Sequence, residues 1–241
     1  MTRCLTGLGA TGEDLKSIQT VSDGLRGDPT LPFRKTTNGR FLIDFDRNDL
    51  RRLEFQEFIL SATEDFALFL FKALMIRGIE THHRPVLDYD LNLCFCTLFN
   101  PRTVTTGDLV GEPALEGLHS DGVEFTMTTF LGAENITDDS ATTFVYDNAE
   151  KTGARWHETD PELLRGQQQH RHLMNTLLFA DAERKHSLMA VEREDPSRDA
   201  TRDMLIFFTR KPVVSGHVSS KYDSLIDHKT LTLRVPLKEV E

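Results

Sequence analysis

The hydrophobic residues follow two different periods, and the change between them divides the chain into a helical part and a strand-rich part. From Asn48, a residue suited to capping a helix N-terminus, leucines and phenylalanines recur at helical spacing as far as Gly78. The stripe predicts one long amphipathic helix, or two in succession, packed on a sheet as a helical buttress over residues 46–80. Its members are Leu50, Leu53, Phe58, Phe66, Phe69, Leu70 and Leu74.

After Pro85 the hydrophobic pattern predicts strands. Short segments alternate between apolar and polar residues or run apolar, with polar turns between them. Several short strands preceded by a helical block indicate an antiparallel sandwich or jelly roll over residues 86–236, with helices on one side. The predicted strands are 88–99, 123–131, 142–146, 173–179, 186–191, 204–209 and 230–235.

The remaining segments are less regular. Residues 1–45 are rich in glycine, threonine and aspartate and predict an irregular arm with at most one short helix. Residues 193–202 predict an exposed loop. No fixed repeat and no low-complexity linker divides the sequence, so we expect a single domain over residues 1–241.

Composition narrows the class of protein. A chain of 241 residues with 39% hydrophobic and 27% charged residues can form a core and is not polar enough to be disordered. The formal net charge of −10 argues against nucleic-acid binding and favours a small-molecule substrate. No apolar run approaches the length of a membrane span, and we see no targeting signal.

The three cysteines are an odd number, which favours a reducing, cytoplasmic location over secretion. Cys94 and Cys96 alternate in an apolar strand-like run, so they share one face. They could bind a metal there, but buried thiols in ordinary core packing are the favoured interpretation. Cys4 lies in the irregular arm.

His119 and Asp121 are the first candidates for chemistry. With one residue between them, both side chains project from the same face of an extended chain and can reach one ion, and Gly122 permits an unusual backbone angle beside them. His186, where a charged turn gives way to an apolar strand, is the predicted third ligand, and His172 is the second choice. Two imidazoles and a carboxylate suit iron(II) and leave its opposite face free.

The other histidines give weaker signals. An H-x-H pair, His170 and His172, stands in a glutamine-rich polar stretch, where a solvated surface is the favoured interpretation. His157, His217 and His228 have no convincing partners, and the neighbouring His82 and His83 precede Pro85 in a predicted turn.

A longer pattern surrounds the H-x-D pair. The string LEGLHSDGVEF over residues 115–125 resembles the signature of the iron(II)/2-oxoglutarate-dependent dioxygenases that act on free amino acids, such as isoleucine dioxygenases. The resemblance continues through residues 144–147, 181–191 and 201–207 and covers about residues 90–210. It implies a mainly β fold with flanking helices (α+β), namely a double-stranded β-helix of the cupin-like jelly-roll type. The long N-terminal helix predicted from the hydrophobic spacing would pack on its sheet.

The resemblance also implies a site and a reaction. His119, Asp121 and His186 would be the catalytic iron ligands, and Arg202 would meet the distal carboxylate of the co-substrate 2-oxoglutarate through a planar fork of hydrogen bonds. With Fe(II) and O2 the enzyme would oxidise an aliphatic C–H bond of a free, aliphatic amino acid or a similar small molecule. The typical outcome is hydroxylation, with release of succinate and CO2.

Several alternatives stay open. The same chemistry could be diverted to ring closure or desaturation of a valine-like substrate in secondary metabolism. A non-oxidative cupin metalloenzyme and a non-catalytic binding module are rivals from other classes, and a homodimer is left open. For a substrate amino acid, Arg84 and Arg102 are candidate partners of the carboxylate, and Glu124 could face the pocket only if Gly122 shifts the register.

Two segments depart from the family pattern. Residues 135–140 stand where a glycine-containing turn is expected, and the first 80 residues match poorly. Since such variable parts often form the substrate-facing surface, the substrate is less defined than the activity. The glycine content of the N-terminal arm suggests a lid over the site.

Overall fold

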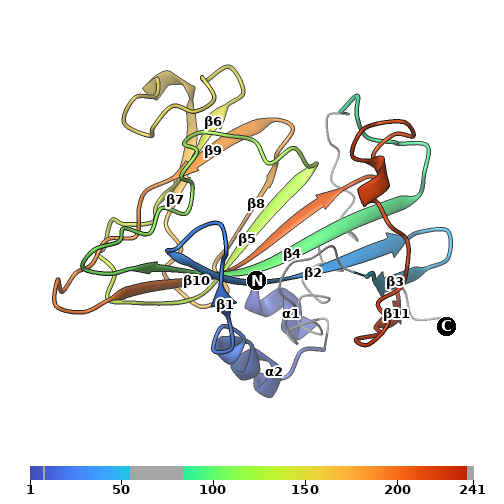
Figure 1. Cartoon of the computed structure of the whole chain (residues 1–241), viewed down its shortest axis with the longest axis horizontal. Helices are drawn as coiled ribbons and strands as arrows, with labels where there is room; N and C mark the ends of the chain where they lie inside the picture. The colour runs from blue at the N-terminus through green and yellow to red at the C-terminus, as the bar shows by residue number, and fades with distance from the viewer. Residues whose placement is uncertain (8, 55–83, 238–241) are drawn as a thin grey trace.

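Two antiparallel sheets form the body of the protein (Figure 1). The computed structural model describes residues 1–7, 9–54 and 84–237. The larger sheet holds eight strands in the order β11-β3-β2-β4-β10-β5-β8, with β1 beside β2, and the smaller sheet has the order β7-β6-β9. The strands are β1 Arg26–Gly27, β2 Arg34–Asp44, β3 Asp49–Arg52, β4 Leu93–Thr105, β5 Phe125–Glu134, β6 Thr143–Asp147, β7 Leu164–Gln168, β8 Thr176–Ala180, β9 Arg184–Leu188, β10 Ala200–Arg210 and β11 Arg234–Pro236.

Short helices complete the described chain. Within the described residues they are α1 Thr2–Gly7, α2 Gly12–Ser17, and the 3-10 turns η1 Ile18–Thr20, η2 Pro161–Leu163 and η3 Ser220–Tyr222. Thr11 caps α2 in a reciprocal arrangement with Asp14, which satisfies free backbone donors of the first turn. Figure 1 shows α1 and α2 together below the larger sheet.

The two faces of the larger sheet have different roles. On one face, Cys96 of β4 and Leu205 and Phe207 of β10 pack with Leu5 of α1 and Ile18 of η1 in the main hydrophobic cluster. Because strand residues alternate between faces, the side chains between these positions point to the other face. That face lines a cavity that the smaller sheet closes from the opposite side. One face therefore stabilises the fold and the other is available for function.

The thiols of Cys94 and Cys96 lie in the packed face, as expected for ordinary core residues. Both are almost fully buried, and burial raises the pKa of the Cys94 thiol to about 12 and that of Cys96 further still. Among the described residues no disulfide joins them. The core-packing interpretation is confirmed.

The β core agrees with the predicted architecture. Each of the seven predicted strands overlaps an observed one: β4, β5, β6, β8, β9, β10 and β11. The prediction missed β7, whose sequence LRGQQ is polar because four of its five residues are exposed. The predicted loop 193–202 ends earlier than expected, since β10 already begins at Ala200.

The N-terminal predictions need correction. Asn48 does not begin a helix: its φ of 52° places it in the tight turn between β2 and β3, a left-handed conformation that asparagine tolerates. Leu50 lies within β3 and Leu53 directly after it, and both are fully buried. The rest of the predicted helix falls on residues 55–83, outside the described residues. The predicted irregular arm holds two short α-helices and all of β2, an 11-residue strand.

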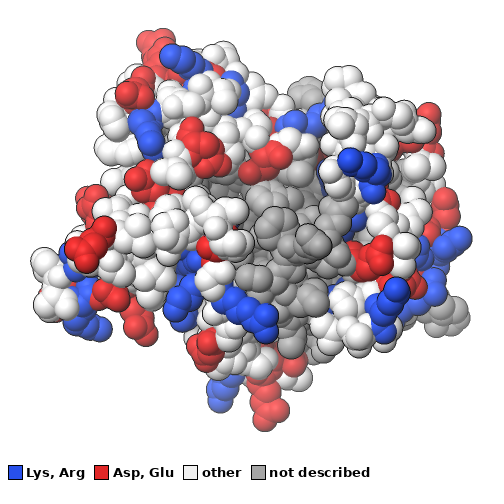
Figure 2. All heavy atoms as spheres, in the orientation of Figure 1, with Lys and Arg blue, Asp and Glu red and all other residues white. Residues whose placement is uncertain are grey.

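Both signs of charge are spread over the face seen in Figure 2, with acidic and basic side chains interspersed among the described residues. None of the helices in the described part of the chain has the length and apolar character that crossing a bilayer would require.

Leu205→Ala tests the packed face. Leu205 is 2% exposed in the central strand β10, so its truncation leaves a cavity and should lower the free energy of unfolding by about 2–5 kcal/mol. Urea denaturation measures the change. The control is Leu225→Ala, since Leu225 is 48% exposed and its loss should cost less than about 0.5 kcal/mol. Equal effects of the two substitutions would contradict this assignment of the core.

Candidate metal centre

Two backbone segments far apart in the sequence meet at His119 and His186. The amide of His119 donates to the carbonyl of His186 at 3.0 Å, and the amide of His186 donates back at 2.9 Å. This reciprocal pair is an isolated antiparallel bridge, and His186 also belongs to β9. Residues paired in this way project their side chains to the same side. The bridge therefore sets the two imidazoles next to each other, with ring centroids 4.4 Å apart.

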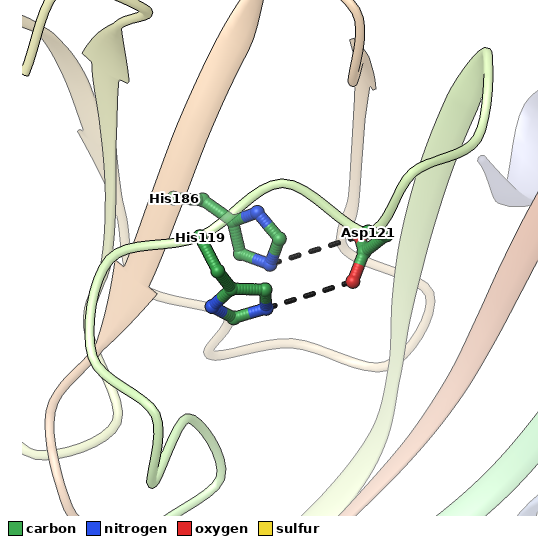
Figure 3. Close-up of side chains that lie close together, drawn as sticks. All are labelled: His119, Asp121 and His186. Atoms are coloured by element: carbon green, nitrogen blue, oxygen red, sulfur yellow. Dashed lines mark ion pairs between the residues drawn. The ribbon is translucent and has the colours of Figure 1, made fainter. Parts of the chain in front are cut away.

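Asp121 completes the group. Figure 3 shows its carboxylate pointing between the two rings. Oδ1 lies 3.5 Å from Nε2 of His119, and Oδ2 lies 3.9 Å from Nε2 of His186. One donor atom from each residue lies within 4.8 Å of the others, so the three could hold a metal ion. Asp121 is outside the strands, and the φ of 80° at Gly122 supplies the unusual backbone angle expected beside it.

Hydrogen bonds orient the donor atoms. Nδ1 of His119 lies 2.8 Å from the carbonyl of Gly117, which fixes a proton on Nδ1 and leaves Nε2 for a metal. Gly117 has a φ of 78°, and a Cβ there would lie 2.8 Å from the carbonyl oxygens of Gly153 and Ala154. Only glycine fits this close approach. Thr126 donates to Oδ2 of Asp121 at 2.6 Å and so orients the carboxylate.

The site favours an anionic carboxylate and one neutral imidazole. Burial works against the charged form of Asp121, but hydrogen bonding by His119 and by the Thr126 hydroxyl lowers its pKa. Burial lowers the pKa of His186 to about 4. Burial also opposes protonation of His119, yet Asp121 and the Gly117 carbonyl raise its pKa to about 9. A bound cation would take the place of that proton on Nε2.

Asp181 anchors the segment that carries Asp121. Its side chain is 0% exposed, and its carboxylate accepts hydrogen bonds from the backbone amides of Asp121, Gly122 and Val123 at 2.8, 2.9 and 3.2 Å. Arg84 adds a fourth contact at 2.7 Å. Burial raises the pKa of Asp181, although the amides and Arg84 act in the opposite direction. A buried carboxylate with four donors fixes the backbone beside the candidate metal ligands.

Sequence reasoning missed Asp181. It was part of a charged turn before His186, and nothing in a lone aspartate distinguishes a buried anchor from a solvated turn residue. Its one usable signal is its position directly after the apolar strand β8, which ends at Ala180.

The candidates for a substrate carboxylate or ammonium, Arg84, Arg102 and Glu124, do not line the cavity described below, and each has a partner elsewhere. Arg84 pairs with Asp181, and Arg102 makes two hydrogen bonds of 2.7 Å with Asp203. Glu124 is 4% exposed and accepts from the Lys211 amide, so it lies outside the cavity lining. Strand alternation already favoured that orientation, and the φ of Gly122 does not turn Glu124 into the pocket.

A cavity of about 250 Å³ lies directly beside the three donor atoms. His119, Asp121 and His186 line one part of it, and Arg202 of β10 lines another. Apolar and aromatic side chains cover much of the remaining wall. They are Phe99, Pro101, Pro113, Ala114, Leu188, Met204, Ile206 and Phe208.

Arg202 is a buried cation in need of an anion. It is 3% exposed, its Nη2 has no hydrogen-bond partner, and no carboxylate of the described residues forms an ion pair with it. Burial lowers its pKa to about 10, which still leaves it charged at neutral pH. An unpaired buried charge is costly unless a ligand supplies the opposite charge. A small molecule that chelates a metal at one end and carries a carboxylate at the other fits this arrangement.

His170 corrects a prediction. It was expected on a solvated surface, yet it is 2% exposed, its Nε2 lies 3.2 Å from the hydroxyl of Thr128, and its Nδ1 has no partner. Burial, and then the positive charge of Arg202, lower its pKa to about 4. A neutral imidazole therefore stands behind the arginine end of the cavity. His172 is exposed, as expected, and lies outside the donor group.

Comparison with known proteins assigns the chain to a family. The model of the 2OG-Fe dioxygenase family matches residues 65–208, which is more than half of the chain. The chain belongs to the 2OG-Fe dioxygenase family. It is thus a non-heme iron enzyme that uses Fe(II), 2-oxoglutarate and O2, and the donor set, the buried arginine and the cavity between them fit these groups.

Two individual proteins resemble almost the whole chain. The solved Fe(II)/α-ketoglutarate-dependent dioxygenase TqaL is 48% identical, covers 97% of this chain and 86% of its own, and superposes with a TM-score of 0.85. The bifunctional enzyme flvA of Aspergillus flavus is 41% identical over 97% of this chain. The chain spans only 31% of flvA.

A more distant structure shares the fold. IDO from Bacillus thuringiensis is 13% identical, with a TM-score of 0.61 over 83% of this chain and 85% of its own. These findings confirm the mainly β, jelly-roll fold class and the enzyme class, so a non-oxidative cupin enzyme and a non-catalytic module are not supported.

Asp181→Asn tests the anchor. An amide of the same size presents an NH2 group where the carboxylate accepts hydrogen bonds, so the segment at Asp121 should lose its fixed position. We expect affinity for Mn(II), measured by calorimetry, to fall about 10- to 100-fold. Asp147→Asn is the control, because Asp147 also accepts from a backbone amide and an arginine but lies on the surface. Unchanged metal affinity in a folded Asp181→Asn protein would refute the anchoring role.

His170→Gln tests the buried imidazole. Because the folded pKa of about 4 lies below the unfolded value of 6.5, the unfolded state binds more protons between these pH values. Stability from this group is therefore complete above pH 6.5 and is lost as the pH falls towards 4. As the pH falls from 6.5 to 4, the free energy of unfolding of the wild type should decrease by on the order of 2 kcal/mol more than that of the variant. Denaturation at several pH values measures this, and exposed His172→Gln should retain the wild-type profile.

Proposed function

We propose that His119, Asp121 and His186 hold the catalytic iron, that Arg202 receives the distal carboxylate of 2-oxoglutarate, and that the enzyme oxidises an aliphatic C–H bond of a free amino acid or a similar small molecule. One observation carries the proposal. Three donor atoms within 4.8 Å and a buried, unpaired guanidinium line the same small cavity. A dicarboxylate that chelates the metal with one end can bind the guanidinium with its other carboxylate at the same time.

Each residue has a task in this reaction. His119 and His186 supply neutral nitrogens and Asp121 supplies a negative oxygen, leaving coordination positions on the cavity side. Arg202 fixes the far end of the co-substrate by paired hydrogen bonds. When bound, iron and 2-oxoglutarate convert O2 into an oxidant that removes hydrogen from a C–H bond, with succinate and CO2 as co-products.

The apolar wall positions the substrate. A C–H bond offers no hydrogen bond, so only shape and the exclusion of water can place it near the metal. Met204, Ile206 and Phe208 follow one another at alternate positions of β10 and lead from Arg202 along the cavity. An aliphatic side chain packed against them would lie beside the reacting centre.

Hydroxylation is the simplest outcome, and ring closure or desaturation of a valine-like substrate in secondary metabolism remains the second candidate. The likeness along almost the whole chain to TqaL, an Fe(II)/α-ketoglutarate-dependent dioxygenase, supports the iron and 2-oxoglutarate chemistry that both outcomes share. Since the chain spans about a third of flvA, we propose for it one oxygenase activity within a single domain of residues 1–241. The free thiols suit a reducing, cytoplasmic compartment.

An anaerobic titration tests the proposal. Fe(II) and 2-oxoglutarate together should give the visible charge-transfer band of the chelate, and oxygen with a panel of aliphatic amino acids should give succinate. His119→Ala should abolish both. Arg202→Gln should raise the KM for 2-oxoglutarate about 100-fold without changing affinity for the metal, because paired charge-assisted bonds are lost. Exposed Arg198→Gln is the control. Full turnover by His119→Ala would rule out this ligand set.

A further inference from the structure

Two charged side chains of the cavity have no role in the metal centre or in holding 2-oxoglutarate. Once His119, Asp121, His186 and Arg202 are assigned, Arg34 and Glu116 are the remaining ionisable residues among the described residues that line it. One is positive and the other negative. Their side chains are 35% and 57% exposed, so both lie towards the open side of the cavity, whereas Arg202 is buried.

Arg34 lies in the same row of the larger sheet as Arg202. Arg34 of β2 and Arg202 of β10 both pair with Thr103 of the strand between them, and all three residues line the cavity. With neighbouring strands about 4.8 Å apart, the two arginine backbones are separated by about 10 Å on one wall. Two carboxylates can therefore be bound by separate cations without competing for one.

Asp28 holds Arg34 in place. Its Oδ2 accepts from Nε of Arg34 at 2.7 Å and forms an ion pair with Nη2, also at 2.7 Å, while its Oδ1 accepts from the amides of Thr30 and Leu31. The Asp28 side chain is 4% exposed, so this support is well packed. Nη1 of Arg34 has no hydrogen bond to any described residue. The edge formed by Nη1 and Nη2 is the one that can receive a carboxylate end-on.

Glu116 reaches the part of the cavity that His119 lines. Its Oε1 lies 3.2 Å from Nε2 of His119. Glu116 therefore presents a carboxylate to the cavity next to the candidate metal ligands. An ammonium group, with three donors and no acceptor, suits a carboxylate in this position.

We propose that Arg34 and Glu116 bind the carboxylate and the ammonium group of a free α-amino acid. A small, partly apolar cavity with one positive and one negative side chain matches a zwitterion. An amino acid inside a peptide has neither a free ammonium group nor a free α-carboxylate, so it would not use these two side chains. The volume of about 250 Å³ is below that of pockets for drug-sized ligands, which also favours a small molecule. The proposal rests on the proposed function, because it assumes that the metal and Arg202 are used as described.

The contact of Arg34 with the carboxylate and that of Glu116 with the ammonium group can be tested separately, by removing one charge from the ligand and the matching charge from the protein. Calorimetry on the full chain loaded with Mn(II) and 2-oxoglutarate, without turnover, would measure binding of L-valine, L-leucine and L-isoleucine. For the one that binds best, the amide derivative lacks the carboxylate charge and the 2-hydroxy acid lacks the ammonium. Wild type should prefer the amino acid to each analogue by about 10- to 100-fold.

Each variant should lose one preference and keep the other. Arg34→Gln should bind the amino acid and its amide equally but still discriminate against the hydroxy acid, and Glu116→Gln should show the reverse. Both should keep affinity for Mn(II) and 2-oxoglutarate within about twofold of wild type, which also reports correct folding. Arg165→Gln is the matched control, since Arg165 pairs with an aspartate on the surface and does not line the cavity.

The outcomes separate this proposal from the proposed function. Failure of Mn(II) or 2-oxoglutarate to bind wild type would overturn the proposed function. Normal binding of both, with no binding of any amino acid or with both preferences intact in the two variants, would overturn only the zwitterion site. Loss of metal affinity in Glu116→Gln would make Glu116 a metal ligand and would also reject its role as the ammonium partner.

Discussion

The structure depends on the pair of backbone hydrogen bonds between His119 and His186. Without them the two imidazoles would belong to segments 67 positions apart with no fixed relation. Backbone bonds are directional and short, so they fix the distance between the rings more tightly than side-chain packing could. The carboxylate of Asp181 then fixes the third donor by accepting hydrogen bonds from the backbone amides of Asp121 and Gly122. Donor geometry is thus set by main chain, and the side chains need only small adjustments.

The larger sheet separates stability from chemistry by the alternation of its strands. In β10, Leu205 and Phe207 pack against the helices, while Arg202, Met204 and Ile206 face the cavity. A substitution on the first set changes packing, and one on the second changes what the cavity accepts. Close relatives can therefore keep the fold and the metal centre while they differ in the residues that contact a substrate. This is why family membership defines the co-substrate more closely than the substrate.

Much of the β core could be predicted from the sequence, because apolar and polar residues alternate along its strands with a period of two, which a helix does not show. The candidate metal ligands followed from a resemblance, and the structure brings all three together. Other features failed for definite reasons. Asn48 favours helix caps and left-handed turns alike, so local preference could not choose between them. His170 and Asp181 sit in polar sequence but are buried by contacts with distant strands, and no local pattern contains that information.

The buried charges that line the cavity destabilise the ligand-free enzyme. Arg202 without an anion, and His119 with a proton where a metal would bind, both carry an electrostatic cost that ligands remove. Binding of metal and 2-oxoglutarate should therefore stabilise the fold by mass action as well as prepare the reaction.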